Sequence, residues 1–343
     1  MHRISEKFWT VGTGRTVKCL LCPHHCVIGE GLWGLCRTRT NREGVLYSVA
    51  YGNPCSVTVD PIEKKPLYHF LPGTDIFSLA TAGCNFHCLN CQNWTISQVS
   101  PLSVGKENLS PVQITETALR YKVPSIAFTY TEPTVFYEYM YDIAGLAHEK
   151  GLKTVMVSNG YINPEPLAAL IPYLDAVNID LKCFDDKIYR KITGGKLQPV
   201  LDTILALGKA GIWIEITHLI IPGITDDPAQ FRSMCRWLVV NGFASAPLHI
   251  SRFFPTYKLA HLTRTPLEHL TRAKTIALEC GILFVYAGNV PDDIQSHTIC
   301  PTCGKTVVER RQYSIIKKNI EKGACGFCHT PIPGVWDFHD ASP

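Results

Sequence analysis

The sequence predicts an α/β fold, with a small cysteine-rich domain before the main domain and another after it. Short β-branched runs alternate with helical patterns from about residue 76 to 289, both ends lack this alternation, and most of the 15 cysteines fall in three groups. Strands that alternate with helices imply parallel pairing through right-handed crossovers. Six or seven such units form a barrel, complete or partial, or an open doubly wound sheet.

The apolar, β-branched runs define the expected strands. They span 77–81, 126–130, 154–158, 176–181, 212–221, 248–253 and 283–287. A glycine, the usual residue at a helix end, stands shortly before several of them, at Gly151, Gly211, Gly242 and Gly281. In both candidate folds the working residues lie at the carboxyl ends of the strands. We predict a cysteine-rich domain at 1–72, the β/α domain at 73–291 and a second small domain at 292–343.

Composition excludes several classes of protein. Hydrophobic residues make up 46% and charged residues 18%, which excludes wholesale disorder. The net charge of +4 is far from the basic excess of a dedicated nucleic-acid binder, and no apolar run is long enough to span a membrane. Without a secretory signal we expect a reducing, cytoplasmic location, where clustered thiols indicate metal binding and not disulfides.

The first expected strand is followed by three closely spaced cysteines, Cys84, Cys88 and Cys91, which we call the cluster loop. A 4Fe-4S cluster normally takes four cysteine ligands, so three leave one iron open. An open coordination position marks a catalytic metal and not a structural one. The alternative is a zinc site of three cysteines and one histidine, with His87 or His24 as the fourth ligand.

Polar residues also follow the next three expected strands. Glu132 offers a carboxylate that can accept hydrogen bonds from an ammonium group, or it merely begins a helix. Ser158 and Asn159 either bind a ligand or form an ordinary Asn-Gly turn. Asp180 and Lys182 share one face of a strand, either as ligand contacts or as a buried ion pair.

The sixth strand adds His249 and Arg252 as candidate pocket residues, although a structural role is the alternative for each. Four cysteines lie outside the groups and are interpreted as small buried hydrophobic residues. These four are Cys55, Cys183, Cys235 and Cys280.

Both end domains carry a group of four clustered cysteines. Two CxxC pairs form the C-terminal quartet, Cys300, Cys303, Cys325 and Cys328, whose spacing predicts a zinc ribbon. The N-terminal quartet is Cys19, Cys22, Cys26 and Cys36, interpreted as a second structural zinc site in which His24 or His25 can replace one thiolate. An auxiliary iron–sulfur cluster is the alternative at either end.

The spacing of the cluster loop after the first strand resembles the radical S-adenosylmethionine (SAM) superfamily. The resemblance implies a partial (β/α)6 TIM-like barrel, a 4Fe-4S cluster and SAM, cleaved reductively to a 5′-deoxyadenosyl radical that abstracts hydrogen from a substrate. It implies that Glu132 binds the SAM amino group and that Ser158 and Asn159 contact its methionyl or ribose groups. Asp180 and Lys182 are similar to a SAM-contacting pair in pyruvate formate-lyase activating enzyme. An electron donor such as ferredoxin or flavodoxin is also implied.

Longer strings resemble the radical SAM enzyme of the AmmeMemoRadiSam system, whose name implies Memo-family and AMMECR-type proteins as partners. These strings span 19–26, 60–73, 193–200, 251–258 and 300–303. One alternative is an activase of a glycyl-radical enzyme. A second, non-enzymatic alternative is a zinc-ribbon adaptor for nucleic acid or protein, with Glu309-Arg310-Arg311 and Lys317-Lys318 as local charge.

Overall fold

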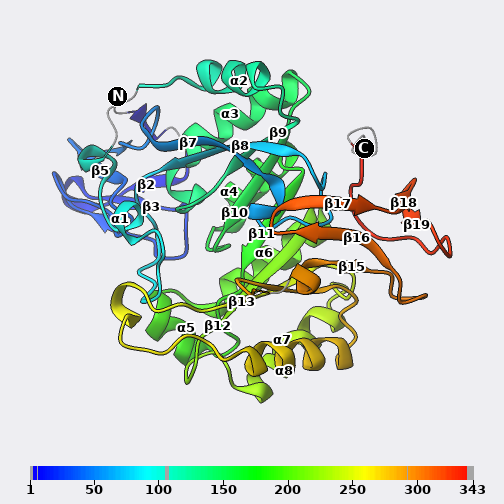
Figure 1. The fold of residues 1–343 in the computed structure, drawn as a ribbon. Coiled ribbons are helices and arrows are strands. Elements are labelled where there is room, and N and C mark those ends of the chain that lie inside the picture. Colours follow the sequence, from blue (N-terminus) through cyan, green and yellow to red (C-terminus); the bar gives the residue numbers. More distant parts are fainter. Residues whose placement is uncertain (1–2, 6, 105–107, 292, 338–343) are drawn as a thin grey trace.

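The computed structural model describes residues 3–5, 7–104, 108–291 and 293–337, and its centre is an eight-stranded sheet (Figure 1). Strand order in this sheet follows chain order throughout, from β7 to β14, without the reversal that defines a doubly wound sheet. The two end strands do not pair with each other, so the barrel is open, and the predicted partial barrel is confirmed. The strands are β7 (Pro54–Pro61), β8 (Asp75–Thr81), β9 (Ser125–Phe128), β10 (Lys153–Ser158), β11 (Ala176–Asp180), β12 (Trp213–Ile220), β13 (Leu248–Arg252) and β14 (Val285–Gly288).

Strands β8 to β14 are parallel, and helices connect them. A helix follows each strand from β8 to β13, which gives six β/α units before the last parallel strand, β14. In Figure 1, α2 and α3 lie at the top of the view and α7 and α8 at the bottom, with the strands between them. The helices are α1 (Trp94–Ser97), α2 (Pro111–Arg120), α3 (Tyr137–Glu149), α4 (Pro164–Leu170), α5 (Asp186–Thr193), α6 (Leu197–Lys209), α7 (Pro228–Val240) and α8 (Leu267–Glu279).

Strand β7 is a feature that the alternation of strands and helices did not predict. It pairs antiparallel with β8, in one register from Pro61 opposite Asp75 to Ser56 opposite Ala80, and the register then shifts by one residue before Pro54, which lies opposite Thr81. Proline at both of its ends suits an edge strand, where a missing N–H costs no ladder hydrogen bond. The strand lies within the residues that we assign to the N-terminal domain, yet it belongs to the central sheet.

The sheet buries its apolar side chains against the helices. Leu79, Phe128, Val177 and Ile250 are all less than 1% exposed and belong to one core. Among the isolated cysteines, Cys183 and Cys235 are buried as expected, whereas Cys55 and Cys280 are only half-buried, so the interpretation of those two as core residues was wrong.

Short strands form both flanking regions. The N-terminal region has two three-stranded sheets, β1-β6-β5 and β2-β3-β4. It is tied to α3 by Arg39, whose guanidinium donates to both Glu138 oxygens at 2.6 and 2.7 Å. These strands are β1 (Arg3–Ile4), β2 (Trp9–Val11), β3 (Val17–Cys19), β4 (Val27–Ile28), β5 (Arg39–Arg42) and β6 (Val45–Ser48).

The C-terminal ribbon (residues 298–337) contains a three-stranded and a two-stranded sheet and packs beside the barrel (Figure 1). Its buried Val307, Val308 and Trp336 share a core with Tyr68 and Tyr286 from outside the ribbon. Within the described ranges, no helix has both the length and the apolar character needed to cross a bilayer. The ribbon strands are β15 (Thr298–Ile299), β16 (Thr306–Arg311), β17 (Ser314–Lys318), β18 (Ile320–Glu321) and β19 (Ala324–Cys325).

The domain limits 1–72, 73–291 and 292–343 stay a prediction, and residues 1–2, 292 and 338–343 lie outside the described part of the chain.

Candidate functional site

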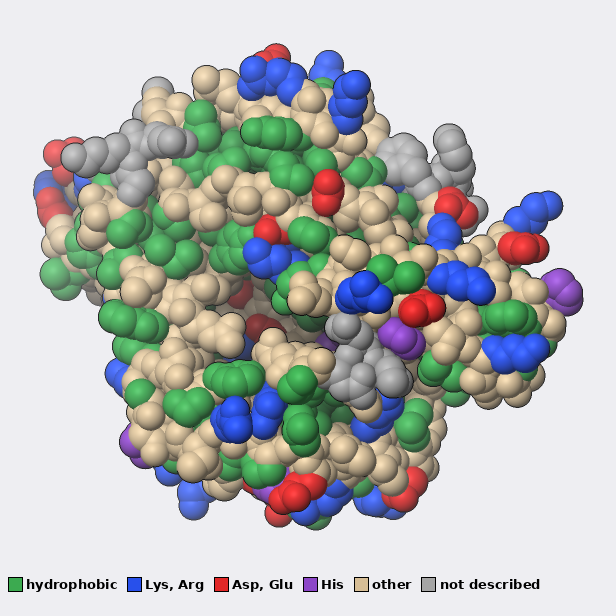
Figure 2. All heavy atoms as spheres, in the orientation of Figure 1, with side chains coloured by type: hydrophobic (Ala, Val, Ile, Leu, Met, Phe, Trp, Pro, Cys, Tyr) green, Lys and Arg blue, Asp and Glu red, His purple; other side chains and the backbone are tan. Residues whose placement is uncertain are grey.

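A cavity of about 730 Å³ occupies the interior of the barrel. It is open to solvent, and the face drawn in Figure 2 is hollowed near its centre. Loops after the parallel strands line one part of it, and the segment 60–73, which we call the floor segment, lines another. Most of the predicted site residues meet here: Cys84, Cys88, Cys91, Glu132, Ser158, Asn159, Asp180, Lys182 and His249.

The cluster loop leaves the end of β8 and is held by backbone hydrogen bonds to the barrel. His87 N donates to Thr193 O at 2.8 Å and Leu89 N to Ile192 O at 2.9 Å. Gly83 starts the loop with a φ of 99°, and a Cβ there would lie 2.4 Å from the Thr38 side chain, so only glycine fits without rearrangement. These contacts hold the three thiols at the cavity wall.

The geometry of the cluster loop suits a multi-iron cluster better than one zinc ion. With zinc–sulfur bonds of about 2.3 Å, two sulfurs on one ion lie at most about 4.6 Å apart. Within the described residues, the C-terminal quartet is the only group of three or more possible ligands whose atoms all lie within 4.8 Å of one another. His87 and His24, the proposed fourth zinc ligands, instead contact Gln98 Oε1 and Asn85 O. In a 4Fe-4S cluster each cysteine binds its own iron, which spreads the sulfurs.

Glu132 is buried at the end of the loop after β9. Its carboxylate accepts hydrogen bonds from Thr134 N at 3.0 Å, Thr134 Oγ1 at 2.7 Å, Ser158 Oγ at 2.8 Å and Asn159 N at 2.9 Å. Burial raises the pKa of this carboxyl, and the hydrogen bonds partly oppose the rise. No cationic side chain forms an ion pair with it in the part of the chain that the structure describes. Glu132 also caps the short 3-10 helix Pro133–Phe136, so the structural alternative and a ligand role coexist.

Asp180 and Lys182 form an ion pair at the end of β11. Lys182 Nζ lies 2.9 Å from Asp180 Oδ2, and both residues line the cavity. Burial works against the charge of Lys182, but the negative charges of Asp180 and of an ionised Cys88 outweigh it and raise the lysine pKa. The pair therefore places a cation beside a cluster-loop cysteine.

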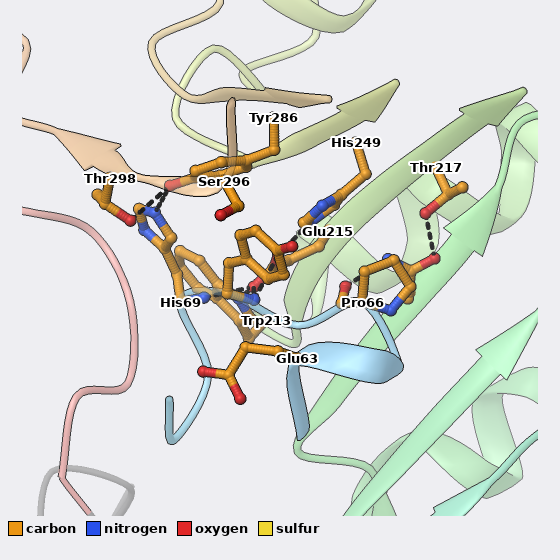
Figure 3. Close-up of polar contacts among 12 residues, drawn as sticks. Glu63, Pro66, His69, Trp213, Glu215, Thr217, His249, Tyr286, Ser296 and Thr298 are labelled. Carbon is orange, nitrogen blue, oxygen red and sulfur yellow. Dashed lines mark hydrogen bonds and ion pairs between the residues drawn. The ribbon is translucent and has the colours of Figure 1, made fainter. Parts of the chain in front are cut away.

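His249 and Arg252 have different environments. His249 lines the cavity, and its Nε2 lies 2.6 Å from Glu215 Oε2 (Figure 3). Arg252 is also buried, but its Nε donates to Thr265 O at 2.7 Å and it does not line the cavity. The structure thus brings only His249 to the candidate site.

A buried polar network behind His249 was not predicted. Glu215 on β12 is fully buried, and its carboxylate accepts hydrogen bonds from the backbone N–H groups of Tyr68 and His69 as well as from His249 (Figure 3). The imidazole of His69 contacts Pro333 O at 2.7 Å and Tyr286 Oη at 2.5 Å. A glutamate inside the apolar run 212–221 was the available sequence signal, because a buried charge needs partners.

Arg310 connects the C-terminal ribbon to the same network. Its guanidinium donates to Tyr68 O at 2.7 Å and to Thr298 Oγ1 at 2.9 Å, and its Nε lies 3.7 Å from Glu63 Oε1. The β16–β17 turn of the ribbon also lines the cavity, through Gln312 and Tyr313. The ribbon is therefore part of the cavity wall.

The C-terminal quartet has the dimensions of a single tetrahedral metal site. Its sulfurs are 3.6 Å apart between Cys300 and Cys328 and 3.8 Å apart between Cys303 and Cys325. A tetrahedron with bonds of about 2.3 Å has edges of about 3.8 Å. The N-terminal quartet differs: its four cysteines line a common hollow without gathering to such distances.

An open barrel that carries a three-cysteine loop and a buried carboxylate at its strand ends defines a class of iron–sulfur enzyme. The family model for the radical SAM superfamily matches residues 78–235, so this part of the barrel is a radical SAM domain. An uncharacterized protein of Methanocaldococcus jannaschii is 46% identical over 318 residues, which cover 92% of this chain and 95% of that protein.

Other similarities are more distant. The pyruvate formate-lyase-activating enzyme of Clostridium pasteurianum is 27% identical over 163 residues, 44% of this chain and 64% of that enzyme. The crystal structure of a radical SAM methyltransferase from Sphaerobacter thermophilus aligns at 14% identity with a TM-score of 0.49, over 64% of this chain and 67% of that one. The family match and the sequence similarity to an activating enzyme show a radical SAM enzyme, a class that uses a 4Fe-4S cluster, SAM and an electron donor such as ferredoxin or flavodoxin.

Proposed function

We propose that this enzyme binds a 4Fe-4S cluster through Cys84, Cys88 and Cys91 and SAM beside it, and acts on a substrate held in the barrel cavity. When bound, these groups supply a 5′-deoxyadenosyl radical for hydrogen abstraction. The observation that carries the proposal is that one cavity is lined by three spread thiols and by a buried carboxylate that has no cationic partner among the described residues. An ammonium group is the partner that such a carboxylate lacks.

The chain's own residues have separate tasks in this proposal. Glu132, oriented by Ser158 and Asn159, accepts hydrogen bonds from the SAM amino group. The Asp180–Lys182 pair offers polar contacts beside Cys88. His249, oriented by Glu215, faces the substrate from the inner part of the cavity.

The C-terminal quartet is proposed to bind zinc, because its sulfur separations match one tetrahedral ion and all four positions are filled by protein. Zinc there would stabilise the ribbon that closes the cavity wall. This role makes the ribbon part of the enzyme and argues against the alternative that the protein is a zinc-ribbon adaptor for nucleic acid or protein.

Membership of the AmmeMemoRadiSam system is proposed from the strings 60–73 and 251–258, with Memo-family and AMMECR-type proteins as partners. Activation of a glycyl-radical enzyme is the second candidate, favoured by the similarity to activating enzymes. The two differ in the group that gives up the hydrogen atom: a cavity-bound molecule in the first, a glycine of a partner protein in the second.

Reductive SAM cleavage tests the proposal. Reduced protein should release 5′-deoxyadenosine and methionine, and the triple change Cys84→Ala, Cys88→Ala, Cys91→Ala should abolish that release. Cys280→Ala, a half-buried thiol outside the three groups, is the matched control and should cleave SAM like the unmodified protein. Continued cleavage by the triple variant would contradict the assignment of the cluster loop.

A further inference from the structure

The N-terminal quartet encloses a space instead of converging on a point. Cys19, Cys22, Cys26 and Cys36 all line one hollow, together with apolar side chains such as Leu21 and Ile28. In the described residues no three of these thiols have sulfurs within 4.8 Å of one another, whereas all four of the C-terminal quartet do. One chain therefore holds two four-cysteine sites of different size.

The size difference distinguishes the metal centres that fit. A single zinc ion keeps every pair of its sulfur ligands within about 4.6 Å. The N-terminal quartet exceeds this limit, as does the cluster loop, whose family uses a four-iron cluster. A 4Fe-4S cluster binds four thiolates through four separate irons, so it requires spread sulfurs around a space.

The nearby histidines are not positioned to complete a smaller site. His24 Nε2 contacts Asn85 O at 2.8 Å, and its ring packs 5.0 Å from the ring of Tyr161. His25 is exposed, and although both histidines line the hollow, no group of three possible ligands that includes either of them lies within 4.8 Å among the described residues. Four thiolates are thus the ligand set, which matches the full complement of a 4Fe-4S cluster.

The surrounding structure is built to hold this hollow in place. Leu20 O and Leu21 O accept hydrogen bonds from Asn163 at 2.6 and 2.9 Å, and Thr38 Oγ1 donates to Val135 O at 2.9 Å. Asn85, which directly follows Cys84, lines the hollow too. The N-terminal quartet is therefore fixed against the loop that carries the catalytic cysteines.

We propose that the N-terminal quartet binds a second 4Fe-4S cluster, coordinated by Cys19, Cys22, Cys26 and Cys36, and not a zinc ion. All four irons are ligated by protein, so this cluster has no open position for SAM. It is an auxiliary centre adjacent to the catalytic one. The C-terminal quartet remains the single-ion site.

Metal content of the anaerobically prepared full chain is the first test. The proposal predicts about eight irons, about eight sulfides and about one zinc per chain. About four irons, with either one or two zinc ions, would overturn it.

Variants assign each cluster. The triple cluster-loop variant should keep about four irons, and the electron paramagnetic resonance signal of its reduced cluster should not change when SAM is added. If the triple variant contains no iron, the second cluster is refuted, because this variant leaves the N-terminal cysteines unchanged. Cys22→Ser with Cys26→Ser should lose about four irons and keep the SAM-sensitive signal, whereas the control Cys55→Ser, on β7, should keep both clusters.

These outcomes separate the auxiliary cluster from the proposed function. If the cluster loop does not bind SAM, the SAM-sensitive signal is missing from the unmodified protein while its iron content stays near eight. If only the auxiliary cluster is wrong, the SAM-sensitive signal is present and the iron content is near four.

Discussion

Replacing Glu132 gives the sharpest test of the candidate SAM site. Glu132→Gln keeps the size of the side chain but removes its charge, so the bound ammonium loses a charge-assisted acceptor. Such hydrogen bonds contribute about 1.5–3 kcal/mol, which corresponds to about 10- to 100-fold weaker SAM binding. Ser158→Ala removes one of the four hydrogen bonds that orient the carboxylate and should weaken binding only several-fold, from a loss of about 1 kcal/mol.

Anaerobic titration calorimetry on cluster-loaded protein measures both affinities. Glu116→Gln, an exposed glutamate on α2, is the control and should bind SAM normally. Because burial raises the pKa of Glu132, SAM affinity should also fall as the pH drops through that raised pKa, and the Gln variant should lack this dependence. Because the pKa of Glu132 is higher in the folded than in the unfolded chain, the free energy of unfolding of the SAM-free protein should fall as the pH rises and this carboxyl ionises. A Gln variant with full iron content and SAM affinity within twofold of the unmodified protein would refute the reasoning.

Three further predictions concern the floor segment and the ribbon. The double variant Cys325→Ser, Cys328→Ser should lose about one zinc per chain, and its ribbon should become protease-sensitive while the iron–sulfur spectrum persists. Loss of iron from this variant would contradict a single-ion site. Burial lowers the pKa of His69 to about 4, so the unfolded chain binds an extra proton below pH 6.5. Its contribution to the free energy of unfolding should therefore fall by about 1.4 kcal/mol from pH 7.5 to 5.5 in urea titrations, and His69→Gln should remove that part of the slope. Arg310→Met leaves the buried Glu63 without its cation and should lower the free energy of unfolding by about 3–5 kcal/mol. Adding Glu63→Gln to this variant should restore most of the lost stability. If the stability losses of the two single variants simply add in the double variant, the two residues are not a coupled pair.

Local pattern was sufficient to predict most of the barrel. The strands from β8 to β14 were expected within a few residues, because buried parallel strands are short apolar runs and glycine ends the helices before several of them. The polar residues of the candidate site were located for a related reason: parallel strands bring their carboxyl ends to one edge, so Glu132, Ser158 and Asp180 share a cavity although they are far apart in sequence. Their contacts with SAM were expected only from the family resemblance.

Long-range partners could not be predicted in the same way. Glu215 meets His249 across 34 positions and His69 across 146, and neither pairing leaves a local periodicity. The two quartets show the same limit, because each begins with a CxxC pair and yet their sulfur arrangements differ. Ligand spacing along the chain constrains which residues can meet but not how far apart their sulfurs stand.

The contacts of the floor segment impose an order on assembly. Leu71 N donates to Val335 O and Val335 N to His69 O, both at 2.7 Å, and Arg310 binds Tyr68 O. Residues 310–335 are synthesised after every strand of the barrel, so these contacts cannot form while the ribbon is still inside the ribosome. During that interval the barrel interior lacks part of its wall. The growing chain thus passes through a stage in which the cavity is wider open than in the finished fold, until the ribbon completes its wall.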